Sequence, residues 1–235
     1  MEKNFEANLI DSAQKAKATR LSFGEELASL GETHKNIVAL DADLSKSTMT
    51  MLFAQKFPER FFNCGIAEAN MIGAAAGLAG AGKIPFAASF GCFLTGRYDQ
   101  IRMSVAFSGA NVRLVGTHAG VGIGEDGHSQ MALEDLALMR SLPNMTVFQP
   151  SDDADTRNFM RWSMTHNGPC YIRLTRQNLP ALNRNEKANF IPGKWDVLNP
   201  LSSEGGLVLI GSGALMGTTI QAADRLVPRL KTLQL

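Results

Sequence analysis

Short apolar runs alternate with helical stretches along most of this 235-residue chain. The runs are continuously apolar, as in Ile37-Val38-Ala39-Leu40, and do not alternate with polar residues. This pattern is typical of strands buried on both faces of a parallel sheet. We therefore expect an α/β fold, with a mostly parallel sheet flanked by helices on both faces. The expected strands are residues 37–40, 61–64, 84–89, 112–116, 145–148 and 170–174, and the expected helices are residues 66–80, 98–107, 133–142 and 152–164. Ser151 is the expected N-cap of the last of these helices.

The composition changes near residue 180, where prolines and asparagines become frequent. We expect residues 1–180 to form one domain and residues 181–204 to form a linker. Residues 205–235 are expected to be the first strand and helix of an incomplete C-terminal α/β domain. Its strand is expected at 207–210 and its helix at 214–230, interrupted by Pro228.

Charge and composition exclude several classes of partner. The chain has 23 basic and 22 acidic side chains and a formal net charge of +1, so we expect no nucleic acid and no membrane as partner. The apolar run at 71–82 is mostly Ala and Gly and is too short to span a bilayer. The cysteines Cys64, Cys92 and Cys170 are few and widely spaced, which favours a reducing, cytoplasmic location.

Glu68 stands in the first turn of an expected helix, directly after a short strand. A glutamate there complements the helix dipole, which explains most such residues. The helix that follows is rich in small residues, including Gly73 and Gly77, and is suited to close packing against another subunit or layer. A carboxylate buried at such a contact would control a protonation state. The residues alone leave both interpretations open.

A glycine loop, Gly-Ile-Gly-Glu-Asp-Gly at 122–127, follows His118. It lacks the lysine of a Walker loop and the ligand spacing of an EF-hand. By itself it is compatible with a metal loop, a phosphate loop or a simple turn.

Aromatic and basic residues stand at other strand ends. Phe90 and Phe93 follow an expected strand, where rings either pack in the core or stack on a heterocyclic ligand. Arg173 and Arg176 flank the end of the last strand of the large domain, where arginines either hold a phosphate or form ordinary ion pairs.

Taken together, these stretches resemble the pyrimidine-binding domain of transketolase, from about Arg20 to Pro180. The matching segments, in the family's order, are Asp-Ala-Asp-Leu at 41–44 with Ser47, Phe-Asn-Cys-Gly-Ile-Ala-Glu at 62–68, Gly-Thr-His at 116–118, Gly-Glu-Asp-Gly at 124–127, Arg-Ser-Leu-Pro-Asn at 140–144 and Leu-Thr-Arg-Gln-Asn-Leu-Pro at 174–180.

The resemblance implies a role for each matching residue. Glu68 matches the glutamate that activates the aminopyrimidine ring of thiamine diphosphate, and His118 matches a catalytic histidine near the substrate hydroxyls. The other residues implied to bind the cofactor are Phe93, Phe90, Asp43 and Ile66. The residues implied to bind a sugar phosphate substrate, besides His118, are Arg20, Ser47, Asp126, His128, Gln130, Arg173 and Arg176.

Two positions depart from the family pattern. After Gly-Glu-Asp, the family usually has Gly-Pro-Ser/Thr-His-Gln, whereas this chain has Gly-His-Ser-Gln-Met at 127–131. Gln130 therefore replaces the expected histidine, and His128 stands two positions earlier; glutamine forms hydrogen bonds but does not shuttle protons near neutral pH. Gly96 stands where a second aromatic residue beside the pyrimidine is expected.

The sequence has no Gly-Asp-Gly…Asn motif, through which the family binds the diphosphate and a divalent metal. The resemblance therefore implies that an N-terminal subunit on another polypeptide holds the diphosphate and Mg²⁺ or Ca²⁺, and no metal ligand is assigned to this chain. The expected assembly is a heterotetramer with two copies of each subunit, which transfers a two-carbon ketol unit between sugar phosphates of the pentose phosphate pathway.

The alternatives are a β-type subunit of a 2-oxoacid dehydrogenase, a deoxyxylulose phosphate synthase-like chain, and a non-catalytic assembly partner. The Gly-Glu-Asp-Gly and Arg-Gln-Asn-Leu-Pro segments argue against the first. The second is normally one long chain.

Overall fold

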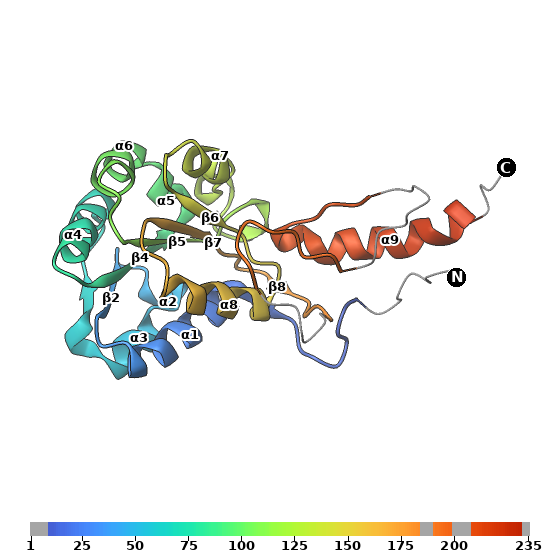
Figure 1. Ribbon diagram of the computed structural model, residues 1–235, viewed down its shortest axis with the longest axis horizontal. Coiled ribbons are helices and arrows are strands. Elements are labelled where there is room, and N and C mark those ends of the chain that lie inside the picture. Colours follow the sequence, from blue (N-terminus) through green and yellow to red (C-terminus); the bar gives the residue numbers. More distant parts are fainter. Residues whose placement is uncertain (1–8, 184–189, 199–207, 232–235) are drawn as a thin grey trace.

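The computed structural model describes residues 9–183, 190–198 and 208–231. A parallel sheet lies between two layers of helices, and the long helix α9 lies to one side of it (Figure 1). Within the described residues, no helix is long and apolar enough to cross a membrane.

The main sheet has six strands in the order β3-β2-β4-β5-β7-β6, and every neighbouring pair is parallel. The central strands are fully buried, which explains why their sequences are continuously apolar. The parallel sheet predicted from the sequence is confirmed, with strand ends shifted by at most one residue. The strands are β2 (Ile37–Asp41), β3 (Phe61–Asn63), β4 (Ile84–Phe90), β5 (Arg113–Thr117), β6 (Thr146–Phe148) and β7 (Cys170–Arg173).

Each face of the sheet has its own apolar core because successive side chains of a strand point to opposite faces. Val38 and Leu40 of β2 pack on one side with α4, α5, η2 and α7. Ile37 and Ala39 pack on the other side with α1, α3 and α8. The helices are α1 (Thr19–Thr33), α2 (Ser45–Thr48), α3 (Met51–Lys56), α4 (Glu68–Gly80), α5 (Gly91–Thr95), α6 (Tyr98–Gln100), the π-helix η2 (Ile101–Phe107), α7 (Asp135–Arg140) and α8 (Asp153–Ser163), with 3-10 turns η1 (Pro58–Arg60), η3 (Val121–Ile123) and η4 (His128–Gln130).

A small antiparallel ladder joins the two ends of the domain. Strand β1 (Lys17–Ala18) pairs with β8 (Asn178–Leu179), so the segment that precedes α1 lies beside the segment that follows β7. Beyond this ladder, α9 (Met216–Lys231), which follows the turn η5 (Gly213–Leu215), contributes Ile220 to a third, smaller cluster with Leu9 and Leu182.

Three local predictions were wrong. The N-cap of α8 is Asp152 and not Ser151, because the Asp152 carboxylate accepts a hydrogen bond from the Asp155 amide at 2.8 Å. Residues 208–210 of the expected strand at 207–210 are not in a strand, and their apolar side chains are exposed; residue 207 lies outside the described residues. Helix α9 continues through Pro228, since one missing backbone donor does not have to end a helix. The expected helix at 98–107 is confirmed, with α6 at Tyr98–Gln100 continuing into the π-helix η2 at Ile101–Phe107.

The expected domain limits stay a prediction. Parts of the linker at 181–204 and of the C-terminal segment at 205–235 lie outside the described residues.

Candidate functional site

The candidate residues gather at the carboxyl ends of the parallel strands. Asp43 follows β2, Phe90 ends β4, His118 follows β5 and Arg176 follows β7. From β2 the chain moves to β3 on one side and then to β4 on the other, so the strand order changes direction between β2 and β4. Open α/β sheets bind ligands at such a switch point, outside the carboxyl ends of the strands.

His118 lies at the centre of this edge. It is 2% exposed, has a positive φ of 57° and stacks on Phe90 with ring centroids 3.9 Å apart. Thr117 donates to the Ser89 carbonyl, so its hydroxyl is free to accept from His118 Nδ1 at 2.9 Å. Arg20 Nη1 lies 3.2 Å from His118 Nε2, and an arginine is always a donor. The network therefore assigns the neutral tautomer with the proton on Nδ1.

The electrostatics agree with a neutral His118. Burial, and after it the Arg20 guanidinium, lowers the pKa of His118 from 6.5 to about 4. At neutral pH the ring therefore accepts a hydrogen bond at Nε2 and carries no charge.

Arg20, in the first turn of α1, and Arg176, after β7, form a cationic pair beside His118. Arg20 donates to the Ser47 carbonyl at 2.7 Å, and Arg176 donates to the Ile123 carbonyl at 2.5 Å and lies 3.4 Å from Asp126. Burial lowers the pKa of Arg20, and the positive charge of Arg176 lowers it further. Within the described part of the chain, the buried Nε of Arg20 makes no hydrogen bond. Two close cations with an unused buried donor are suited to an anion such as a phosphate.

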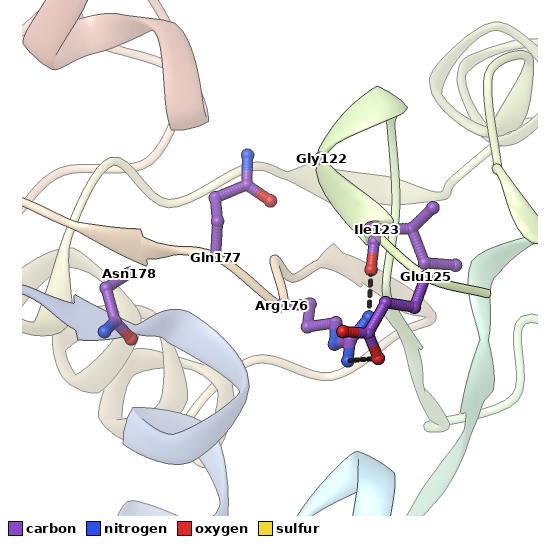
Figure 2. Close-up of a pocket in the computed structure, with 7 residues that line it drawn as sticks. Gly122, Ile123, Glu125, Arg176, Gln177 and Asn178 are labelled. Carbon is purple, nitrogen blue, oxygen red and sulfur yellow. Dashed lines mark hydrogen bonds and ion pairs between the residues drawn. The ribbon is translucent and has the colours of Figure 1, made fainter. Parts of the chain in front are cut away.

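A hollow of about 360 Å³ opens beside Arg176 (Figure 2). Arg176, Gln177 and Asn178 form one wall, and the glycine loop from Gly122 to Glu125 forms the other. A Cβ on Gly122 would lie 2.2 Å from Gln177 Oε1, so a larger residue there would displace the Gln177 side chain into the hollow. The exposed Glu125 carboxylate, which also lines the hollow, lies 3.9 Å from Arg176 Nη2.

Glu68 is the first residue of α4 and is 6% exposed. Ser89 donates to one carboxylate oxygen at 3.3 Å, and among the described residues this is the one hydrogen bond to the Glu68 side chain. Phe93 is half-buried and stacks on Phe90 with ring centroids 5.5 Å apart and planes 7° apart. A buried carboxylate with a single weak partner at Ser89, the residue before Phe90, would suit a planar heterocycle with a ring nitrogen.

Asp41 is a supporting residue to which the sequence analysis assigned no role. Its buried carboxylate accepts hydrogen bonds from the Leu44 amide, the Thr48 hydroxyl and the Thr50 hydroxyl at 2.5–2.9 Å. Burial raises the pKa of Asp41. These bonds fix the loop after β2, which carries Asp43 with a positive φ of 65°. The sequence did carry a sign of this role, because an acid stands at the end of a strand that is otherwise apolar.

The structure does not bring all the predicted site residues together. Arg173 Nε donates to the fully buried Asp135 carboxylate at 2.9 Å, and Arg173 Nη2 donates to the Ala132 carbonyl at 3.1 Å. Its guanidinium is therefore bound to Asp135 and to the backbone at Ala132. Ile66 is 86% exposed, and His128 is also exposed. Gln130 Oε1 is buried and makes no hydrogen bond within the described residues.

No three His, Cys, Asp or Glu side chains of the described residues are close enough to hold a metal ion. The buried acids Asp41, Glu68 and Asp135 belong to separate hydrogen-bonded groups.

Comparison with known proteins gives a consistent result. Residues 15–181 match the family model of the transketolase pyrimidine-binding domain. The chain is 46% identical over 210 residues to a Methanocaldococcus jannaschii protein described as "Putative transketolase C-terminal section", covering 88% of this chain and 66% of that protein. It is 42% identical over 211 residues to human transketolase, covering 89% of this chain and 33% of the human protein.

Solved structures show the same fold. A structure described as "Split gene transketolase, inactive beta4 tetramer" has a TM-score of 0.68 and 48% identity, over 77% of this chain and 58% of that chain. The transketolase of Campylobacter jejuni has a TM-score of 0.66 and 31% identity, over 72% of this chain and 27% of that chain. The chain thus spans about two thirds of the length of the M. jannaschii relative and one third of the human one.

Proposed function

The chain belongs to the transketolase family, and on that premise we propose that it is the C-terminal section of a thiamine-diphosphate-dependent transketolase. In this proposal, the enzyme transfers a two-carbon ketol unit from a ketose phosphate to an aldose phosphate. The single observation that carries the proposal is the buried Glu68 carboxylate at the start of α4, bound by Ser89, which precedes the stacked Phe90 in β4.

Glu68 is the residue that we assign to the aminopyrimidine ring. Its carboxylate would accept a hydrogen bond from a protonated ring nitrogen, and Ser89 would hold the carboxylate in place through the 3.3 Å hydrogen bond. Burial excludes water, so that hydrogen bond is stronger than in solvent. When bound, thiamine diphosphate supplies the carbon nucleophile of the reaction, and the protein orients and tunes it. Phe93 is assigned to pack on the ring.

The cationic pair is assigned to the phosphate of the sugar. Arg20 and Arg176 would bind its oxygens, because guanidinium groups form strong charge-assisted hydrogen bonds with phosphate. Asp126, 3.4 Å from Arg176, would accept from a sugar hydroxyl. His118, which burial keeps neutral with a pKa of about 4, would orient the Arg20 guanidinium toward the phosphate through Nε2.

A second chain is part of the proposal. The described residues hold no group of potential metal ligands, and the sequence has no diphosphate motif, so an N-terminal section would hold the diphosphate and Mg²⁺ or Ca²⁺. The solved split-gene transketolase whose description calls its β4 tetramer inactive supports the view that this section alone is inactive. We propose two copies of each section in the active assembly.

The test is a ketol-transfer assay with both sections, thiamine diphosphate, Mg²⁺, a ketose phosphate and an aldose phosphate. Glu68→Gln should lower turnover at least about 100-fold while the unfolding midpoint stays unchanged, because general acid–base groups contribute about 10²–10⁴ in rate. Glu59→Gln, an exposed acid in the turn before β3, is the matched control and should keep full activity. Unchanged turnover in Glu68→Gln would remove this residue from the mechanism. Activity of this chain without its partner would contradict the two-section proposal.

A further inference from the structure

Two buried threonines contact one another across most of the chain. Thr19 is 0% exposed and Thr175 is 4% exposed, and their hydroxyl oxygens lie 3.1 Å apart although 156 residues separate them in sequence. The Thr175 amide also donates to the Thr19 hydroxyl at 2.8 Å, and the Thr175 hydroxyl donates to the Gln177 carbonyl at 3.0 Å.

The direction of each hydrogen bond follows from these contacts. The Thr175 hydroxyl gives its proton to Gln177, so the Thr19 hydroxyl must be the donor in the contact between the two oxygens. Thr19 then accepts from the Thr175 amide and donates to the Thr175 hydroxyl. Every proton in this buried group has an acceptor, and a fully satisfied buried network is rigid.

Each threonine immediately precedes one arginine of the cationic pair, Arg20 or Arg176. The arginines come from opposite ends of the domain and repel one another, and the positive charge of Arg176 lowers the pKa of Arg20. The hydrogen bonds between Thr19 and Thr175 join the two segments that carry these arginines and so oppose their repulsion. The β1–β8 ladder, in which Ala18 pairs with Asn178, brings the two segments together next to the threonines.

We propose that Thr19 and Thr175 are positioning residues, which form a hydroxyl clamp that sets the spacing of Arg20 and Arg176 for a phosphate group. This inference rests on the proposed phosphate site, and it adds the reason why two repelling cations stand at one place. Valine has nearly the shape of threonine but no hydroxyl, so Thr→Val removes the clamp with little change of volume. Serine retains the hydroxyl.

The first readout is phosphate affinity of the full chain, measured from the rise of the unfolding midpoint with inorganic phosphate at constant ionic strength. Thr19→Val and Thr175→Val should each weaken the affinity about five- to tenfold, because each removes two hydrogen bonds that position the arginines. Thr175→Ser should restore most of it. The control is Thr156→Val: this buried threonine also precedes an arginine and donates to a backbone carbonyl at 2.7 Å, but it lies in α8.

The second readout is KM in the assembled enzyme. The valine variants should raise KM for a phosphorylated donor about fivefold or more and leave KM for an unphosphorylated donor within twofold, whereas general loss of structure would change both. Phosphate affinity unchanged in both valine variants, but lost in Arg176→Gln, would overturn the clamp and leave the phosphate site intact. Phosphate affinity unchanged in Arg176→Gln as well would overturn the phosphate site itself.

Discussion

Replacing Asp135 with asparagine should destabilise the protein strongly, although the two side chains have almost the same shape. Asp135 is fully buried and accepts a hydrogen bond from the Tyr171 hydroxyl at 2.8 Å. Arg173 Nε donates to both of its carboxylate oxygens, at 2.9 Å to Oδ2 and 3.1 Å to Oδ1. Asparagine removes the negative charge and leaves the Arg173 guanidinium, whose side chain is 13% exposed, without its counter-ion. Breaking a buried ion pair in this way costs about 3–5 kcal/mol. For a protein of this size, that lowers the unfolding midpoint by about 10 °C.

The assay is urea unfolding of a double-mutant cycle with Asp135→Asn, Arg173→Met and the double variant. The double variant should recover part of the loss, with a coupling free energy of about 2 kcal/mol or more, because no charge is then left buried alone. Tyr171→Phe removes one hydrogen bond and should lower the free energy of unfolding by only about 1 kcal/mol. A loss below about 1 kcal/mol in Asp135→Asn, or additive single losses, would refute the view of Asp135 and Arg173 as a buried pair.

The remaining predictions concern pH and ion pairs. The pKa of His118 is about 4 in the folded chain against an ordinary 6.5, so the unfolded chain binds one more proton between these values. The contribution of neutral His118 to stability is complete above pH 6.5 and is lost as the pH falls toward 4. His118→Asn should therefore have a smaller difference in unfolding free energy between pH 7 and pH 5 than the unchanged chain, measured by urea titration. An equal difference in both proteins would contradict the assignment. Glu26, 4% exposed at its side chain, binds Arg157 at 2.9 Å and Arg161 at 2.7 Å. Glu26→Gln should lower the free energy of unfolding by about 2 kcal/mol, whereas Glu32→Gln, which breaks an exposed pair, should have little effect; similar losses in both would show that burial is not the cause.

The sheet was predictable because its central strands are buried on both faces, and strands of this kind consist mainly of apolar residues. The apolar runs around Ile37 and Ile84 can therefore be recognised as buried strands from the sequence alone. Predictions failed where tertiary contacts decide. The apolar segment at 208–210 has no strand paired with it among the described residues, and without a partner it does not form a ladder.

The site was predictable residue by residue only where the family resemblance reached. It names Arg20, His118 and Arg176, and the structure brings these three together. It does not name Thr19 or Thr175, because a threonine next to an arginine carries no signal until two distant segments meet. For Arg173 the resemblance suggested too much. Its position at a strand end suggested that it binds a ligand, but its guanidinium forms an ion pair with the buried Asp135 of α7. The roles of all these residues stay predictions.

The ladder between β1 and β8 also sets an order in time. During synthesis the strands from β2 to β5 and Glu68 leave the ribosome well before Thr175, so the first part of the sheet can pair while the cationic site still lacks one of its arginines. Closing a contact across 156 residues is slow compared with local pairing, since chain entropy must be lost before the contact forms. If Arg20 and Arg176 bind phosphate as proposed, a nascent chain would gain this affinity only after the Thr19–Thr175 contact forms, and a bound phosphate compound would stabilise only molecules that have completed it.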